Sequence, residues 1–114
     1  MIFISAMEED TKDWKLRLRY GKLSTTFKHF AVLADGVVGK LGDGFECRPG
    51  RAWMSMKTWA TDADESMDMI RVIGERIGFT VDGRIEVYVT EPDQPPGEKP
   101  HGYDIRFTPY DENA

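Results

Sequence analysis

One amphipathic segment, residues 61–78, constrains the fold of this chain more than any other stretch. Apolar residues recur there at the spacing of a helical face, namely Ala63, Met67, Ile70, Gly74 and Ile77. Thr61 with Asp64 three residues later is a variant of the capping box, and Gly78 is a typical residue for ending a helix. The pattern predicts one main helix of about residues 62–77, whose apolar face needs a sheet to cover it.

Gly74 stands in the middle of this apolar face, where glycine costs about 1 kcal/mol of helix propensity relative to alanine. A glycine is tolerated at such a position when its small size lets the helix approach its neighbour closely. The segment therefore predicts a helix that sits close to the sheet.

Strand-like alternation fills most of the remaining sequence. In residues 14–20, four apolar or aromatic side chains alternate with three basic ones, which is typical of a sheet with one dry and one wet face. Further strands are expected at about residues 25–34, 51–60, 84–90 and 103–108, with a short N-terminal strand within residues 1–10. This order predicts a single α+β domain over residues 1–114. Its mostly antiparallel sheet has about five or six strands, with the helix packed on one face.

A proline-rich segment, residues 91–102, separates the last two expected strands. Its four prolines favour a stiff, polyproline-like loop and exclude a crossover helix. Because a parallel pair would need such a crossover, the loop is compatible with an antiparallel pairing of the last two strands, and the order of the strands in the sheet stays open. Residues 111–114 follow Pro109 and are expected to fray.

Length and composition indicate one folded domain. Hydrophobic residues make up 40% of the 114 residues, and the 31% that are charged are mixed in sign. No apolar run approaches the roughly 18 residues of a membrane span, and the N-terminus lacks the basic region of a signal peptide. A single cysteine, Cys47, excludes an internal disulfide and fits a reducing compartment, so we expect a cytoplasmic protein.

Charge is distributed unevenly along the chain. Residues 11–61 carry ten Lys and Arg against four Asp and Glu, whereas residues 62–114 carry five against thirteen. Such an asymmetry points to a charged partner or to self-association, but it specifies no chemistry.

The sequence contains no recognisable catalytic, metal or cofactor motif. It has no Cys-x-x-Cys or His-x-x-x-His pair, it lacks the EF-hand pattern, and its glycine-rich stretch fits no phosphate-binding loop. We therefore expect no metal, no cofactor and no catalytic residue. The alternative is a small enzyme or ligand-binding domain with a site near the 91–104 loop. Four polar side chains lie close together there, Glu98, His101, Tyr103 and Asp104.

The strand of residues 51–60 carries the most informative surface. Trp53, Lys57 and Trp59 lie on one of its faces, and two methionines lie on the other. If the methionines face the helix, both tryptophans lie on the outer face, where exposed Trp typically anchors a protein partner. The alternative, in which the tryptophans face the core, stays open at this point.

A basic face is expected on the strand of residues 14–20, formed by Lys15, Arg17 and Arg19. Such a face can contact phosphates, which makes nucleic-acid binding a weaker alternative. Two observations count against it, because the net charge is −5 and the aromatic residues of this strand lie on its opposite face. We expect the basic face to meet solvent or the acidic half of the same molecule, and we expect neither nucleic acid nor a membrane as a partner.

The sequence thus predicts a small, acidic, non-catalytic protein-binding domain of an interaction or inhibitor type. It would present a charged and aromatic surface to another protein or to a second copy of itself. The residues expected to carry binding are Trp53, Lys57, Trp59, His101 and Tyr103. In general layout the chain resembles small bacterial immunity-type or inhibitor proteins, although no motif identifies it as a member of a family.

Overall fold

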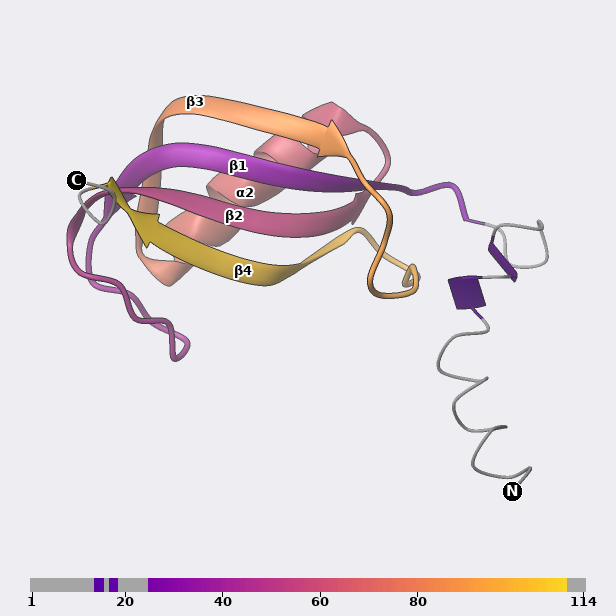
Figure 1. Ribbon diagram of the computed structural model, residues 1–114, viewed down its shortest axis with the longest axis horizontal. Coiled ribbons are helices and arrows are strands. Elements are labelled where there is room, and N and C mark those ends of the chain that lie inside the picture. The colour runs from indigo at the N-terminus through magenta and orange to yellow at the C-terminus, as the bar shows by residue number, and fades with distance from the viewer. Residues whose placement is uncertain (1–13, 16, 19–24, 111–114) are drawn as a thin grey trace, which may run out of the picture.

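A computed structural model describes residues 14–15, 17–18 and 25–110 of the chain. Its regular elements are β1 (Lys28–Val38), β2 (Gly50–Ala60), α2 (Ala63–Ile77), β3 (Phe79–Val89) and β4 (His101–Pro109). The strands form one antiparallel sheet in the order β3-β1-β2-β4, and α2 lies across one face of it (Figure 1). This confirms the predicted α+β architecture, with four strands in the described residues in place of five or six. The expected strand within residues 1–10, Arg19 and the expected frayed end at 111–114 lie outside the described residues.

The strand expected at residues 14–20 is wrong for the part of it that the structure describes. Trp14 and Leu18 are helical and half-buried, and Lys15 and Arg17 are helical and exposed. Residues four apart share a face in a helix as well as in a strand, so the alternation of so short a segment fits both periods. Lys15 and Arg17 therefore do not form the basic face of a strand.

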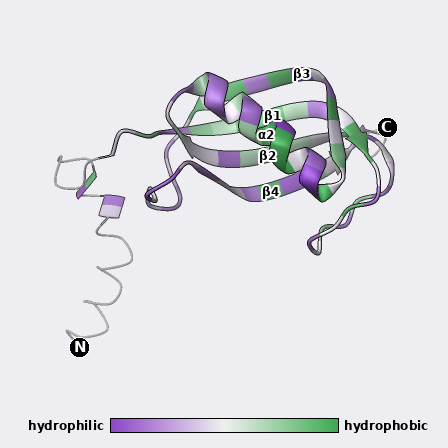
Figure 2. Cartoon of the chain, turned by 180° about the vertical axis from the view of Figure 1, so that it is seen from behind, coloured by the Kyte–Doolittle hydropathy of each residue, from purple (hydrophilic) through white to green (hydrophobic). Residues whose placement is uncertain are grey.

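The core lies between the sheet and α2, as the alternation in the two central strands requires. Val32 and Ala34 of β1 and Met54 and Met56 of β2 are buried on the side of the sheet that faces the helix. Figure 2 shows this layer from behind, with α2 in front of the sheet. The methionine face of residues 51–60 is therefore the helix face, and the tryptophan face points to the other side.

Gly74 allows the close approach of the helix that the sequence predicts. A Cβ atom at Gly74 would lie 3.2 Å from Sδ of Met54 and 3.2 Å from the carbonyl oxygen of Phe79. Both distances are tighter than ordinary van der Waals contact. The glycine thus sits where α2 touches β2 and the start of β3.

The ends of α2 match the predicted signals, with the N-cap displaced by one residue. Asp62, rather than Thr61, is the N-cap, and its Oδ1 accepts a hydrogen bond from the backbone N–H of Glu65 at 2.8 Å. Oε1 of Glu65 accepts in return from the N–H of Thr61 at 2.6 Å. At the other end, Gly78 has a φ of 123° and donates its N–H to the carbonyl of Gly74 at 2.9 Å. The expected glycine stop is confirmed.

The strand order, which the sequence left open, places the last two strands apart from each other. β3 pairs with β1 and β4 pairs with β2, so the two lie at opposite edges of the sheet. The hairpin of β1 and β2 supplies both central strands, and each later strand adds to a free side of that hairpin. The proline-rich segment therefore crosses the end of the sheet, from β3 to β4 (Figure 1).

Candidate functional site

The candidate site is the face of the sheet opposite α2, called the open face below. Residues that pair directly across an antiparallel sheet share a face. The register therefore places side chains from all four strands together there, namely His29, Ala31, Leu33, Trp53, Ser55, Lys57, Trp59, Glu86, Tyr88, Tyr103 and Arg106. No described helix covers this face.

A shallow groove of about 420 Å³ lies on the open face. Ala31 and Leu33 of β1 and Ser55 of β2 line it from the central strands. Tyr88 of β3 lines it from one edge strand, with Asp104 and Arg106 on the other. Small and apolar residues in the centre thus lie between an aromatic ring and a pair of charges.

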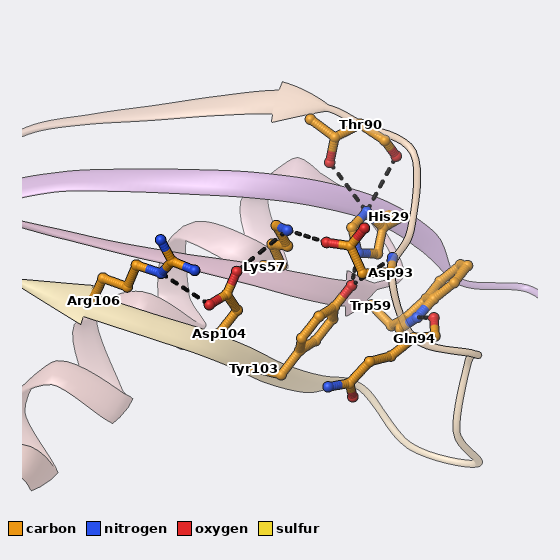
Figure 3. Close-up of polar contacts among 9 residues, drawn as sticks. All are labelled: His29, Lys57, Trp59, Thr90, Asp93, Gln94, Tyr103, Asp104 and Arg106. Atoms are coloured by element: carbon orange, nitrogen blue, oxygen red, sulfur yellow. Dashed lines mark hydrogen bonds and ion pairs between the residues drawn. The ribbon is translucent and has the colours of Figure 1, made fainter.

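Lys57 connects the groove to the loop that follows β3. Its Nζ contacts a carboxylate oxygen of Asp93 and lies 3.3 Å from Oδ2 of Asp104 (Figure 3). The hydrogen bond to Asp93 is the main cause that raises the pKa of Lys57, and the same bond lowers the pKa of Asp93. The ammonium charge is therefore matched by carboxylates of the chain itself.

A bulge in β4 brings Asp104 onto the open face. Asp104 has a φ of 54°, and the pairing of β2 with β4 shifts between Ser55 and Lys57. The simple alternation of the sequence would point Asp104 away from Tyr103. The extra residue of the bulge lets Asp104 reach Lys57 while Tyr103 reaches His29 on the same face. Nε of Arg106 donates to Oδ1 of Asp104 at 3.1 Å. Partial burial works to raise the pKa of Asp104, but the bonds from Lys57 and Arg106 lower it overall.

His29 forms a buried polar cluster at the end of the open face that the loop crosses. Its Nδ1 lies 3.1 Å from both the carbonyl oxygen and Oγ1 of Thr90, and its Nε2 lies 2.6 Å from the hydroxyl of Tyr103. The N–H of Asp93 donates to that same hydroxyl at 3.1 Å. The carbonyl oxygen of Thr90 can only accept, so Nδ1 carries the ring proton, and in the neutral ring Nε2 accepts from the Tyr103 hydroxyl. Burial lowers the pKa of His29 and so favours this neutral form.

Trp59 is covered by the same loop. Its Nε1 donates to the carbonyl oxygen of Gln94 at 2.8 Å, its ring meets His29 edge-on at 5.1 Å, and only 3% of the residue is exposed. Trp53, at the other end of β2, is half-buried and stacks on Tyr110 at 5.8 Å. The two tryptophans share a face as predicted, but the loop removes Trp59 from contact with solvent.

The far end of the open face is held by an ion-pair network. Arg51 of β2 donates to Asp35 of β1 at 3.0 Å and to Asp82 of β3 at 2.8 Å. Its hydrogen bonds to Asp82 and then Asp35 raise the pKa of the guanidinium, and the bond from Arg51 lowers the pKa of Asp82. The network ties three strands together where β3 is irregular.

The predicted binding residues meet only in part. Lys57, Trp59 and Tyr103 gather around the loop, and His101 joins them, with its ring 6.1 Å from Tyr103 and its Nδ1 3.2 Å from the carbonyl oxygen of Lys99. Trp53 lies apart from this group. Lys15 approaches the loop from the N-terminal side, where it helps to lower the pKa of Asp93 and lines a hollow of about 180 Å³ with Trp14, Leu18, Glu91 and Pro92.

Sequence reasoning missed several residues of the open face: His29, Tyr88, Asp93 and Arg106. Tyr88 lies in a strand that the sequence predicts, and its alternation with Val87 and Val89 was the available signal for its face. His29 and Asp93 come together only through the path of the loop, which no local pattern specifies.

Comparisons with known proteins add no assignment. No protein-family model matches the chain, and neither the curated proteins nor the solved structures contain a match. Within the described residues, no group of three or more His, Cys, Asp and Glu side chains is arranged to hold a metal ion. No helix in that part of the chain is both long and apolar enough to cross a membrane.

Proposed function

We propose that this chain is a non-catalytic protein-binding domain whose open face receives an apolar side chain of its partner next to a carboxylate. The observation that carries the proposal is the groove, which joins an apolar centre at Ala31 and Leu33 to an exposed ring at Tyr88 and a guanidinium at Arg106. Protein-binding surfaces typically combine an aromatic anchor, an arginine and a pocket in this way.

The proposal that the partner supplies an apolar side chain rests on the size of the groove and on the exposure of Tyr88. The groove, at about 420 Å³, falls within the roughly 300–1,000 Å³ of typical ligand pockets. It is open rather than enclosed, which suits a side chain presented on another protein surface. Tyr88 is 52% exposed in the free chain, so covering its ring would remove apolar area from water.

The proposal that the partner supplies a carboxylate rests on the charged side chains around the groove. Lys57 is already matched by Asp93 and Asp104, whereas Arg106 uses only its Nε toward Asp104 among the described residues. The side chain of Arg106 is 73% exposed. Its two Nη groups can therefore form the forked pair of hydrogen bonds that guanidinium groups make with carboxylates.

A phage-displayed random peptide library, selected on the immobilised protein, tests the proposal. We expect the enriched peptides to share an apolar residue next to Asp or Glu. A synthetic peptide of that sequence should bind Arg106→Gln and Tyr88→Ala at least about tenfold more weakly than the unmodified chain, a loss of about 1.4 kcal/mol.

Arg71→Gln is the matched control, because Arg71 lies on α2, on the other side of the sheet, and its side chain is 52% exposed. It should bind the selected peptide with unchanged affinity. Failure of the library to enrich any sequence, or equal binding by Arg106→Gln and Arg71→Gln, would overturn the proposal.

A second candidate function, a small enzyme or ligand-binding site near the 91–104 loop, is favoured by one observation. The 2.6 Å contact of neutral His29 with Tyr103 lies directly beneath that loop. A fragment screen followed through the NMR signals of the His29 ring tests it. Fragments that shift those signals would support the candidate, and no shift at millimolar fragment concentrations would remove it.

A further inference from the structure

The two edges of the sheet differ in how well they are protected against pairing with another strand. Exposed edges are usually blocked by bulges, prolines or charges. β4 carries a bulge at Asp104 and ends at Pro109, which has no backbone N–H. The first half of β3 is irregular, since its pairing with β1 shifts between Val81 and Ile85. Residues 85–89 of β3 are the regular remainder of that edge.

The end of this remainder is exposed, whereas Ile85 and Val87 are half-buried against the core. Val89 is 81% exposed, which is the highest value among the large exposed hydrophobic residues of the described chain, and Tyr88 is 52% exposed. Among the described residues, neither a bulge, a proline nor a lysine protects residues 85–89, and Glu86 is their one charge.

One hydrogen bond determines which residues of β3 turn their backbone N–H and C=O groups toward β1 and which turn them outward. The N–H of Thr90 donates to the carbonyl oxygen of His29 at 3.2 Å, so Thr90 turns its polar backbone groups toward β1. In an antiparallel ladder alternate residues turn these groups to opposite sides of the strand. Ile85, Val87 and Val89 therefore direct theirs away from β1, toward the open edge.

We propose that the chain forms a symmetric dimer through residues 85–89 of β3, with a second copy of itself as the partner. Antiparallel pairing about a twofold axis at Val87 places Ile85 opposite Val89 of the second copy. It pairs the outward backbone groups of all three residues with one another. On the open face, Glu86 lies opposite Tyr88 of the second copy, so the Tyr88 hydroxyl, which donates to Glu86 of its own chain, can exchange that bond for one to the carboxylate across the seam.

Two alternative registers fit less well. An axis at Glu86 would set two glutamates directly opposite each other, which is unfavourable. An axis at Ile85 would extend the pairing into residues 81–84, where the edge is irregular. The axis at Val87 avoids both faults and uses only the regular part of the strand.

This dimer would join the two four-stranded sheets into one continuous sheet. Tyr88 lines the groove of each copy, so both grooves would open on the same face of the joined sheet, one on each side of the seam. The inference is independent of the proposed function, because the edge can pair whether or not the grooves bind a partner. Five residues from each copy make a small interface, and interfaces below about 1,200 Å² are typically weak and transient.

Sedimentation equilibrium from about 10 µM to about 1 mM tests the dimer, a range that covers weak dissociation constants. We expect a reversible monomer–dimer equilibrium. Val89→Lys should weaken it at least about tenfold, because a charge replaces an apolar contact at the seam. Val72→Lys, on the exposed side of α2, is the matched control and should leave it unchanged. A strictly monomeric chain, or a dimer that Val89→Lys leaves intact, would overturn the proposal.

Cysteine cross-linking tests the register in a Cys47→Ser background. Val87→Cys should give a disulfide-linked dimer on mild oxidation, because the twofold axis brings position 87 of both copies together. Ile85→Cys should not, since it faces position 89 of the second copy. Far-UV circular dichroism confirms that each variant is folded. Cross-linking of Ile85→Cys as fast as that of Val87→Cys would contradict this register.

Discussion

Nε2 of His29 lies 2.6 Å from the hydroxyl of Tyr103, 74 positions later in the chain. The two residues belong to β1 and β4, which are not neighbours in the sheet because β2 lies between them. The contact therefore crosses over β2 at the end of the open face. With Thr90 and Asp93 it fixes the path of the loop that crosses this end (Figure 3).

Tyr103→Phe should destabilise the fold by about 1–3 kcal/mol, because it leaves buried Nε2 of His29 without its donor. It also removes the oxygen that accepts from the N–H of Asp93. Urea unfolding measures the change in free energy. Tyr110→Phe is a tyrosine control at the opposite end of the open face, and it should cost less because its hydroxyl bonds the exposed network at Asp35. Equal losses in the two variants would show that the His29 contact carries no special weight.

The stability of the chain should fall as the pH drops from about 7.5 to about 5. Burial lowers the pKa of His29 below the 6.5 of the unfolded chain, so the unfolded state binds a proton first. The stabilisation is complete above the unfolded pKa and is lost as the pH falls from there to the folded pKa. The pKa values of Asp93 and Asp104 are lowered from 3.8, so their contribution is lost only in more acidic solution.

Urea unfolding at several pH values checks this dependence. His29→Gln should flatten the curve between about pH 7.5 and about pH 5, whereas His101→Gln should keep the slope that His29 causes. A curve that keeps its slope in His29→Gln would assign the pH dependence to another group.

The two tryptophans of β2 should respond differently to truncation. Trp59→Ala should cost about 3–5 kcal/mol, because it empties a buried site beneath the loop. Trp53→Ala loses a stacked contact with Tyr110, worth about 0.5–1.5 kcal/mol, and the burial of a half-exposed ring, so it should cost less than Trp59→Ala. Thermal or urea unfolding measures both. A larger loss for Trp53→Ala would place Trp53, rather than Trp59, in the better packed position.

The N-cap of α2 should lie at Asp62 in solution as well. Asp62→Ala removes the acceptor of the Glu65 N–H and should cost about 1 kcal/mol. Thr61→Ala should cost less, since the backbone N–H of Thr61, and not its hydroxyl, bonds Glu65. The reverse order of the two losses in urea unfolding would return the cap to Thr61.

The helix α2 and its close packing on the sheet could be predicted because the sequence signals for both are local. The apolar spacing from Ala63 to Ile77, the glycine at position 78 and the small residue at position 74 all act within a few residues of chain. The segment 14–20 was misassigned for the same reason, because Trp14 and Leu18 satisfy two periods at once. Short segments with both patterns need a tertiary neighbour to decide between them.

The candidate site was harder to predict because pairing partners and loops assemble it. Trp53, Lys57 and Trp59 were placed on one face correctly by alternation alone. Whether that face is covered depends on the loop, which buries Trp59 through Gln94 and leaves the groove beside Lys57 open. The bulge at Asp104 and the opposite placement of β3 and β4 are likewise set by the whole sheet.

Backbone amide NMR, with the selected apolar–acidic peptide as titrant, tests the central claim most directly. We predict that the shifted amides belong to residues 31–33 of β1, 55–57 of β2 and 104–106 of β4, around the groove of the open face. Amides on the exposed side of α2, such as those of Arg71 and Val72, should stay in place. Shifts that gather on α2 and leave the groove unchanged would contradict the claim that the open face is the binding surface.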